Sequence, residues 1–244
     1  MVSGSRFRVL IFDLDDTLLD TWAQLVQPAA REACQAMVAA GLATDVTTCL
    51  GKRAALFREA PRADLYASLV AFFGVDTARA DGLDEAAHRR RVRDAGYDAY
   101  FKRDVRGPLR PFDGVYELLE ALQAEHRLHL VTSGSPPTQQ RKIELLALAG
   151  YFHGIHLVDS PAGQKKESAL TAIRATYAHV EAHHFLCVGD RVDREIRAAN
   201  QLGMVSCRIR YGEFAHLDAR DAFEEPHYEL SEVIALREVL IQRS

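Results

Sequence analysis

Two aspartates separated by one residue, Asp13 and Asp15, directly follow an apolar run that begins Val9-Leu10-Ile11. A short apolar and β-branched run indicates a buried parallel strand, and functional groups gather at the carboxyl ends of such strands. Two carboxylates held close together repel each other unless a cation or a proton relieves them. The segment therefore favours a site for a hard divalent ion such as Mg²⁺. The alternative is a strand end whose solvated aspartates cap a helix.

Two further segments could bind an anion. Thr132 and Ser133 follow the strand expected over Leu128–Val131, and a small-residue turn there would present a hydroxyl and backbone N–H groups. Lys165 and Lys166 open a later helix, where a lysine can reach a phosphate and neutralise a carboxylate. Each signal is weak alone, since Ser-Gly turns and surface lysines are common.

A stronger signal is the Gly189-Asp190 pair, which ends the apolar strand expected over Phe185–Val188. A glycine lets the backbone turn sharply at the sheet edge, and the aspartate is then free to supply an oxygen ligand. Asp193 and Glu195 follow on the first turn of a helix. The helix dipole favours acidic residues there whether or not they serve a site.

Composition sets the class of protein. The chain has 244 residues, of which 48% are hydrophobic and 26% charged, a globular balance. The net charge of -4 offers no basic field for nucleic acid or anionic lipid. No secretory signal or membrane-spanning stretch is expected. Cys187 and Cys207 fall in expected strands and are interpreted as core thiols, which indicates a reducing compartment, and we expect a cytoplasmic protein. The charge and the absence of a spanning stretch lead us to expect no nucleic-acid or membrane partner.

The long stretch after the first strand is helical in character. Ala, Leu and Arg dominate it, and helices are expected over Thr21–Ala40, Lys52–Glu59, Arg62–Phe73 and Asp84–Arg103. A glycine and two prolines within Gly107–Pro111 then form a stiff connector, which is typical of a boundary between units.

Beyond this connector, strands and helices alternate. Strands are expected over Leu128–Val131, Ile155–Val158, Phe185–Val188, Val205–Ile209 and Tyr228–Leu230, and helices over Thr138–Ala149, Glu167–Tyr177 and Val192–Leu202, with further helices through Val115 and at the end. Such alternation predicts an α/β fold with a doubly wound, Rossmann-like parallel sheet. We expect residues 1–19 and 107–244 to form this core, and residues 20–106 to form an inserted all-helical cap that acts as a lid.

The order of these segments resembles the haloacid dehalogenase (HAD) superfamily, in particular its phosphatase branch with a helical cap after the first motif. Its four motifs are matched by Asp13, Asp15 and Thr17; by Thr132; by Lys166 or Lys165; and by Gly189 with Asp190. Two departures stand out. Glu195 occupies a position where many relatives have aspartate, and Glu167, not proline, follows Lys166.

The resemblance implies hydrolysis of a phosphomonoester through an aspartyl-phosphate. It implies that Asp13 is the nucleophile and that Asp15 is the acid and base. It implies that Thr132, Ser133 and Lys166 bind the phosphate, and that Mg²⁺ is bound by Asp13, the Asp15 carbonyl and Asp190. Supporting roles fall to Thr17, Gly189, Asp193 and Glu195. Asp15 favours a phosphatase over a 2-haloacid dehalogenase, because a halide leaving group needs no proton.

Several alternatives stay open at this stage. A phosphomutase acting on a sugar phosphate would use the same nucleophile, and a non-catalytic phosphate-binding module or an interaction scaffold would keep the fold. We expect a small phosphorylated metabolite as the partner, and a monomer or homodimer. The cap would select the substrate, with Lys52, Arg53, Arg58 and Tyr66 as candidate contacts.

Overall fold

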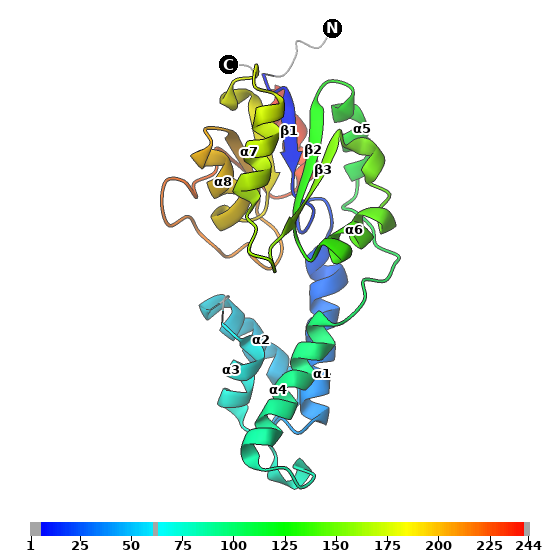
Figure 1. Ribbon diagram of the computed structural model, residues 1–244, viewed down its shortest axis with the longest axis vertical. Coiled ribbons are helices and arrows are strands. Elements are labelled where there is room, and N and C mark those ends of the chain that lie inside the picture. Colours follow the sequence, from blue (N-terminus) through cyan, green and yellow to red (C-terminus); the bar gives the residue numbers. More distant parts are fainter. Residues whose placement is uncertain (1–5, 61–62, 242–244) are drawn as a thin grey trace. The chain divides into compact units, whose positions relative to one another are not determined.

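The computed structural model describes residues 6–60 and 63–241. The chain divides into two compact units: residues 6–22 with 105–241 form an α/β unit, and residues 23–104 form a helical unit (Figure 1). Within the described residues, no helix has the length and apolar character needed to cross a membrane.

The α/β unit is built on a parallel sheet. Its strands among the described residues are β1 (Val9–Phe12), β2 (Arg127–Gly134), β3 (Gly154–Asp159), β4 (Phe185–Gly189), β5 (Val205–Ile209) and β6 (Tyr228–Leu230). All five pairings are parallel, in the order β3-β2-β1-β4-β5-β6. The central strands β1 and β4 are buried along their whole length, as expected for a sheet covered on both faces. The predicted doubly wound α/β fold is confirmed.

Helices pack on both faces of this sheet. They are α5 (Val115–Gln123), α6 (Pro136–Leu145), α7 (Lys166–Thr176), α8 (Arg197–Gln201) and α9 (Leu236–Ile241), and a π-helical turn, η5 (Val192–Ile196), leads into α8. Figure 1 shows α7 and α8 on one side of the sheet and α5 on the other. Leu170 and Ile173 of α7 pack with alternate residues of β1 and β4, including Ile11 and Cys187. This packing fixes the start of α7 beside the ends of these strands.

The predicted end of β2 was wrong. The turn expected from Thr132 to Ser135 does not begin at Thr132, because β2 continues through Gly134. Thr132 pairs with Leu157 of β3, and Gly134 pairs with Asp159. The neighbouring strand is long enough to extend the ladder, and its backbone partners outweigh the turn tendency of a Ser-Gly pair. Ser135 directly precedes α6 as its N-cap residue.

The helical unit contains α1 (Gln27–Ala39), α2 (Val46–Glu59), α3 (Leu65–Phe73) and α4 (Glu85–Phe101), and a π-helical turn, η1 (Trp22–Val26), precedes α1. The start predicted for α2 at Lys52 was wrong by six residues, because Asp45 caps the helix earlier. Its carboxylate accepts hydrogen bonds from the backbone N–H groups of Thr47 and Thr48. Arg62, the predicted start of α3, lies outside the described residues.

Helices α1 and α4 approach each other closely at a glycine. A Cβ placed on Gly96 of α4 would lie 2.6 Å from Met37 Cγ and 2.8 Å from Tyr66 Cδ1. Met37 and Tyr66 belong to the buried core of this unit and have little room to move. Gly51, an exposed residue inside α2, differs because an added Cβ would meet no atom within 4 Å.

These two glycines give a matched test of the packing. Gly96→Ala is expected to lower the free energy of unfolding by about 1–3 kcal/mol, because the methyl group overpacks the core. Gly51→Ala is expected to raise it by up to about 1 kcal/mol through helix propensity. Urea unfolding followed by circular dichroism checks both values. Two changes of the same sign would contradict the close approach of α1 and α4.

Candidate active site

Three buried carboxylates meet at the carboxyl edge of the sheet. Asp13 follows β1, and its backbone N–H donates to the carbonyl of Val188 on β4 at 2.9 Å. Asp190 follows β4, and Glu195 comes from η5 one turn later. One carboxylate oxygen of each of these three residues lies within 4.8 Å of those of the other two. The parallel register of β1 and β4 therefore brings together two aspartates that are far apart in the sequence.

Lys166 supplies the positive charge in this cluster. It begins α7, and its Nζ lies 2.7 Å from Asp13 Oδ1 and also pairs with Glu195. The side chains of Lys166 and Asp13 are only 5% and 7% exposed, so the pair is shielded from water. Lys165 is exposed and is the N-cap residue of α7. Of the two lysines left open by the sequence, it is Lys166 that contacts the carboxylates.

Glu195 is held at both of its carboxylate oxygens. One pairs with Lys166, and Oε2 accepts a hydrogen bond of 3.1 Å from the backbone N–H of Arg191. Gly189 provides the space for the glutamate's longer side chain, because a Cβ there would lie 2.6 Å from Glu195 Cγ. The glutamate at this position is thus accommodated by a residue without a side chain.

The electrostatics of the cluster call for a cation or a proton. Burial raises the pKa of Asp13 to about 7, with Lys166 opposing and Glu195 adding to the rise. Burial and the charge of Glu195 also raise the pKa of Asp190 well above its usual range. Burial alone would lower the pKa of Lys166, but Asp13 and Glu195 outweigh it and raise that pKa. One ammonium facing three carboxylates leaves negative charge uncompensated, and an all-oxygen donor set suits Mg²⁺.

The side chain of Asp15 faces a different set of partners. Its Oδ1 accepts hydrogen bonds from Lys142 Nζ at 2.7 Å and Thr21 Oγ1 at 2.5 Å, and its Oδ2 accepts one from Gln139 Nε2 at 2.8 Å. Burial would raise the pKa of Asp15, but Lys142 and the hydrogen bonds from Gln139 and Thr21 outweigh it and lower that pKa. The two aspartates of the first segment therefore lie in opposite electrostatic environments.

The second segment lies beside Asp15. Thr132 is fully buried, and its Oγ1 accepts a hydrogen bond of 2.8 Å from Gln139 Nε2. The Ser133 carbonyl lies 2.7 Å from the same nitrogen. Thr17 is also fully buried, and its hydroxyl has no hydrogen-bond partner among the described residues. Gln139 thus links the Thr132 hydroxyl to Asp15.

Asp193 stands apart from the carboxylate cluster. Its two carboxylate oxygens accept hydrogen bonds from Arg191 Nε and a terminal nitrogen of the same guanidinium, each at 3.0 Å. The guanidinium carbon also lies 3.7 Å from the centre of the Phe214 ring. The structure thus pairs Asp193 of η5 with Arg191 and not with the carboxylate cluster.

Three polar residues near the site had no role in the sequence prediction. Gln139 and Lys142 lie three residues apart on the buried side of α6, a spacing that puts both on one helix face. Asp16 has a left-handed backbone (φ 53°), and its Oδ1 accepts a hydrogen bond of 2.7 Å from Trp22 N–H. Two long polar residues at core spacing could have pointed to α6, but their partner on another segment could not be read from sequence.

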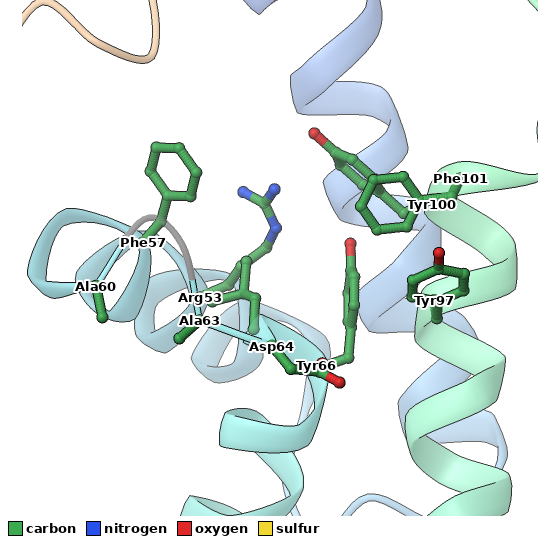
Figure 2. A pocket seen from close by; sticks show the side chains of 10 residues that line it. Arg53, Phe57, Ala60, Ala63, Asp64, Tyr66, Tyr97, Tyr100 and Phe101 are labelled. Carbon is green, nitrogen blue, oxygen red and sulfur yellow. The ribbon is translucent and has the colours of Figure 1, made fainter. Parts of the chain in front are cut away.

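The helical unit has a cavity of its own, of about 480 Å³ (Figure 2). Arg53 lines it and is only 4% exposed, with its guanidinium carbon 5.1 Å from the centre of the Tyr100 ring. The remaining walls are largely aromatic, formed by Phe57, Tyr66, Tyr97, Tyr100 and Phe101. Of the cap residues singled out by sequence, Arg53 and Tyr66 line this cavity, whereas the Lys52 ammonium lies over the Phe72 ring at 4.0 Å.

These features define the class of protein: a doubly wound α/β fold with an inserted helical unit and a buried site of carboxylates and one lysine at the carboxyl edge of its sheet. The family model for haloacid dehalogenase-like hydrolases matches residues 7–203. The chain belongs to this family, which confirms the resemblance seen in its sequence.

Known proteins match over nearly the full chain. Glyceraldehyde 3-phosphate phosphatase of Methanopyrus kandleri is 28% identical over 96% of this chain and 97% of its own. Phosphoglycolate phosphatase of Agrobacterium fabrum is 26% identical over 100% of this chain and 96% of its own. The crystal structure of the Bacillus subtilis HAD-hydrolase YfnB bound to magnesium shares the fold, with a TM-score of 0.60 and 21% identity over 96% of this chain and 99% of its own.

The contact between Gly189 and Glu195 can be tested by a double-mutant cycle. Gly189→Ala is expected to lower the free energy of unfolding by about 1–3 kcal/mol, because its Cβ overlaps Glu195. In a Glu195→Ala background, which lacks the Cγ and Cδ atoms, the same change should cost at least about 0.5 kcal/mol less. Urea unfolding of the four proteins gives the difference. An equal cost in both backgrounds would show that Glu195 does not require the glycine.

Proposed function

We propose that this protein is a Mg²⁺-dependent phosphomonoester hydrolase that acts through an aspartyl-phosphate on Asp13. The observation that carries the proposal is the position of Asp13, buried at the end of β1 with Lys166 2.7 Å away and with Asp190 and Glu195 beside it. The names of the M. kandleri and A. fabrum relatives, both phosphatases of small phosphate esters, support the reaction class.

In the first step, an Asp13 carboxylate oxygen attacks the phosphorus of the ester. The new bond between this oxygen and phosphorus forms as the bond to the leaving alcohol breaks, and Asp15 gives the alcohol its proton. The substrate's phosphate brings negative charge next to Asp15, which favours the protonated form of this carboxyl against the influence of Lys142. The products of this step are the free alcohol and Asp13 carrying the phosphoryl group.

In the second step, water attacks the same phosphorus. Asp15, now a carboxylate, takes a proton from the water, the bond to Asp13 breaks, and inorganic phosphate leaves. The low pKa of Asp15 suits it to hold the charged form between the two steps. Asp13 and the protonated Asp15 are then ready for another substrate.

Phosphoryl oxygens would be held by Lys166 and by the Thr132 and Ser133 segment. A buried ammonium and an ordered hydroxyl stabilise negative charge more strongly than solvated groups do. Glu195 also pairs with Lys166, and Gly189 leaves room for Glu195. Thr17 is fully buried, and its backbone N–H donates to the carbonyl of Leu14, so it would support the turn after β1.

Asp13 and Asp190 would hold Mg²⁺ through their side chains, and Asp15 through its backbone carbonyl. When bound, the ion supplies positive charge that lets an anionic carboxylate approach an anionic phosphate. The raised pKa values of Asp13 and Asp190 support this assignment, since both report carboxylates that lack a sufficient counter-charge.

The helical unit would select the substrate. Its cavity falls within the range of about 300–1,000 Å³ typical of small-molecule sites, and Figure 2 shows the Arg53 guanidinium between Phe57 and the tyrosines. An arginine among aromatic rings suits a planar or anionic group. The substrate class is thus a small phosphorylated metabolite whose non-phosphate part is polar or charged.

The nucleophile is tested by Asp13→Asn, which keeps the side chain's shape but removes its charge. We expect hydrolysis of a panel of phosphorylated metabolites and of p-nitrophenyl phosphate to fall by at least about 10⁴-fold. Asp113→Asn, at an exposed position of the same unit, is the matched control and should keep full activity. Phosphate release with and without chelator is the measurement. Activity of Asp13→Asn near that of the control would overturn the covalent mechanism.

The metal site is tested through stability. Because the pKa of Asp190 is raised in the folded protein, the fold binds more protons than the unfolded chain, and stability falls as pH rises through the window between the two pKa values. Above that window, in chelator, Asp190→Asn should therefore raise the melting temperature. Mg²⁺ at 100 times its Kd should stabilise the wild type by about 2.7 kcal/mol, and Asp190→Asn much less. Equal stabilisation of both by Mg²⁺ would exclude Asp190 as a ligand.

A further inference from the structure

Asp15 is fixed by buried donors that no step of the mechanism above has used. Lys142 and Gln139 reach it from α6, and these residues are only 7% and 2% exposed. Together with Thr21, they supply hydrogen bonds to both carboxylate oxygens. All of these residues belong to the α/β unit. Hydrogen bonds to both carboxylate oxygens therefore fix the orientation of the Asp15 side chain.

Gln139 extends this arrangement to the phosphate-binding segment. Its Nε2 lies 2.8 Å from Asp15 Oδ2, 2.8 Å from Thr132 Oγ1 and 2.7 Å from the Ser133 carbonyl. A single amide group thus contacts both the carboxylate that exchanges protons and the residues that would hold the phosphoryl group. One buried side chain therefore bridges these two parts of the site.

We propose that Lys142 and Gln139 are positioning residues, which aim the Asp15 carboxyl at the leaving-group oxygen of a phosphoryl group held at Thr132. This inference rests on the proposed function, because it takes Asp15 as the acid. Misplacement of a reacting group by about 1 Å can cost on the order of 100-fold in rate. Donors at both oxygens prevent such a displacement.

A purely structural role accounts less well for these residues. Taking the Lys142 ammonium out of water is costly, and its partner Asp15 keeps only 28% of its side chain exposed. Apolar residues of similar size often stabilise a fold as well as or better than such a pair. The neighbouring Ile143 on α6 is a buried core residue of the ordinary kind. An ion pair at this place, with an amide that also reaches Thr132, instead serves the geometry of Asp15.

The two roles differ in how they depend on the leaving group. p-Nitrophenolate leaves without needing a proton, whereas phenolate, with a conjugate acid of pKa about 10 like that of tyrosine, gains from protonation. The ratio kcat/KM covers only the steps through loss of the leaving group, so it reports the acid step and excludes the later attack of water. A residue that positions Asp15 should therefore affect phenyl phosphate more than p-nitrophenyl phosphate.

The experiment compares Lys142→Met and Gln139→Met with the controls Arg141→Met and Gln140→Met, which change exposed residues of the same helix. The readout is kcat/KM for phenyl phosphate and for p-nitrophenyl phosphate in the full-length protein with Mg²⁺. We expect both buried variants to lose at least about tenfold on phenyl phosphate and less than about threefold on p-nitrophenyl phosphate. The controls should match the wild type on both esters.

Equal losses on both esters, or no loss on phenyl phosphate, would overturn the inference. Retained hydrolysis of p-nitrophenyl phosphate, together with an unchanged circular dichroism spectrum, shows that a variant is folded. If one variant does not fold, the other decides, and failure of both to fold would assign the two residues to stability alone. Wild-type protein that cleaves neither ester, or an active Asp13→Asn, would instead refute the proposed function itself.

Discussion

The ion pair of Lys166 with Asp13 and Glu195 is the interaction on which the rest of the site depends. It joins β1, α7 and η5 at one buried point. Burying each charge costs several kcal/mol, so the cluster persists because the sheet and its packed helices hold it in place. The same burial leaves the carboxylates short of positive charge, which is the condition that a divalent cation and an anionic substrate can satisfy together.

The two aspartates of the first segment show how one strand end can serve two chemical tasks. Asp13 faces the buried carboxylates, and its pKa is raised; Asp15 faces Lys142 and Gln139, and its pKa is lowered. Residues two apart on an extended strand point to the same face, but β1 ends at Phe12 and the chain turns directly after it. This turn lets the two carboxylates reach different partners. Opposite environments for neighbouring carboxyl groups are the usual basis for dividing a nucleophile from an acid and base.

The sequence predicted what depends on local pattern and missed what depends on tertiary pairing. Apolar runs located β1 and β4, and hence the positions of Asp13 and Asp190 at one sheet edge. The sequence favoured Lys166 but left Lys165 open, because the choice is decided by which side chain is buried. The continuation of β2 past Thr132 depends on a partner strand. Lys142 looked like any helical lysine, since its partner Asp15 lies 127 residues away in the chain.

The most direct test of the mechanism is to trap the phosphorylated enzyme. Wild-type protein turning over a phosphate ester with Mg²⁺ is quenched in acid, digested, and analysed by mass spectrometry for a phosphoryl group. The mechanism predicts one phosphoryl group on the peptide that contains Asp13, located on that side chain and removed by hydroxylamine. A phosphoryl group on another residue, or active enzyme in which no quench time yields a phosphorylated peptide, would contradict it.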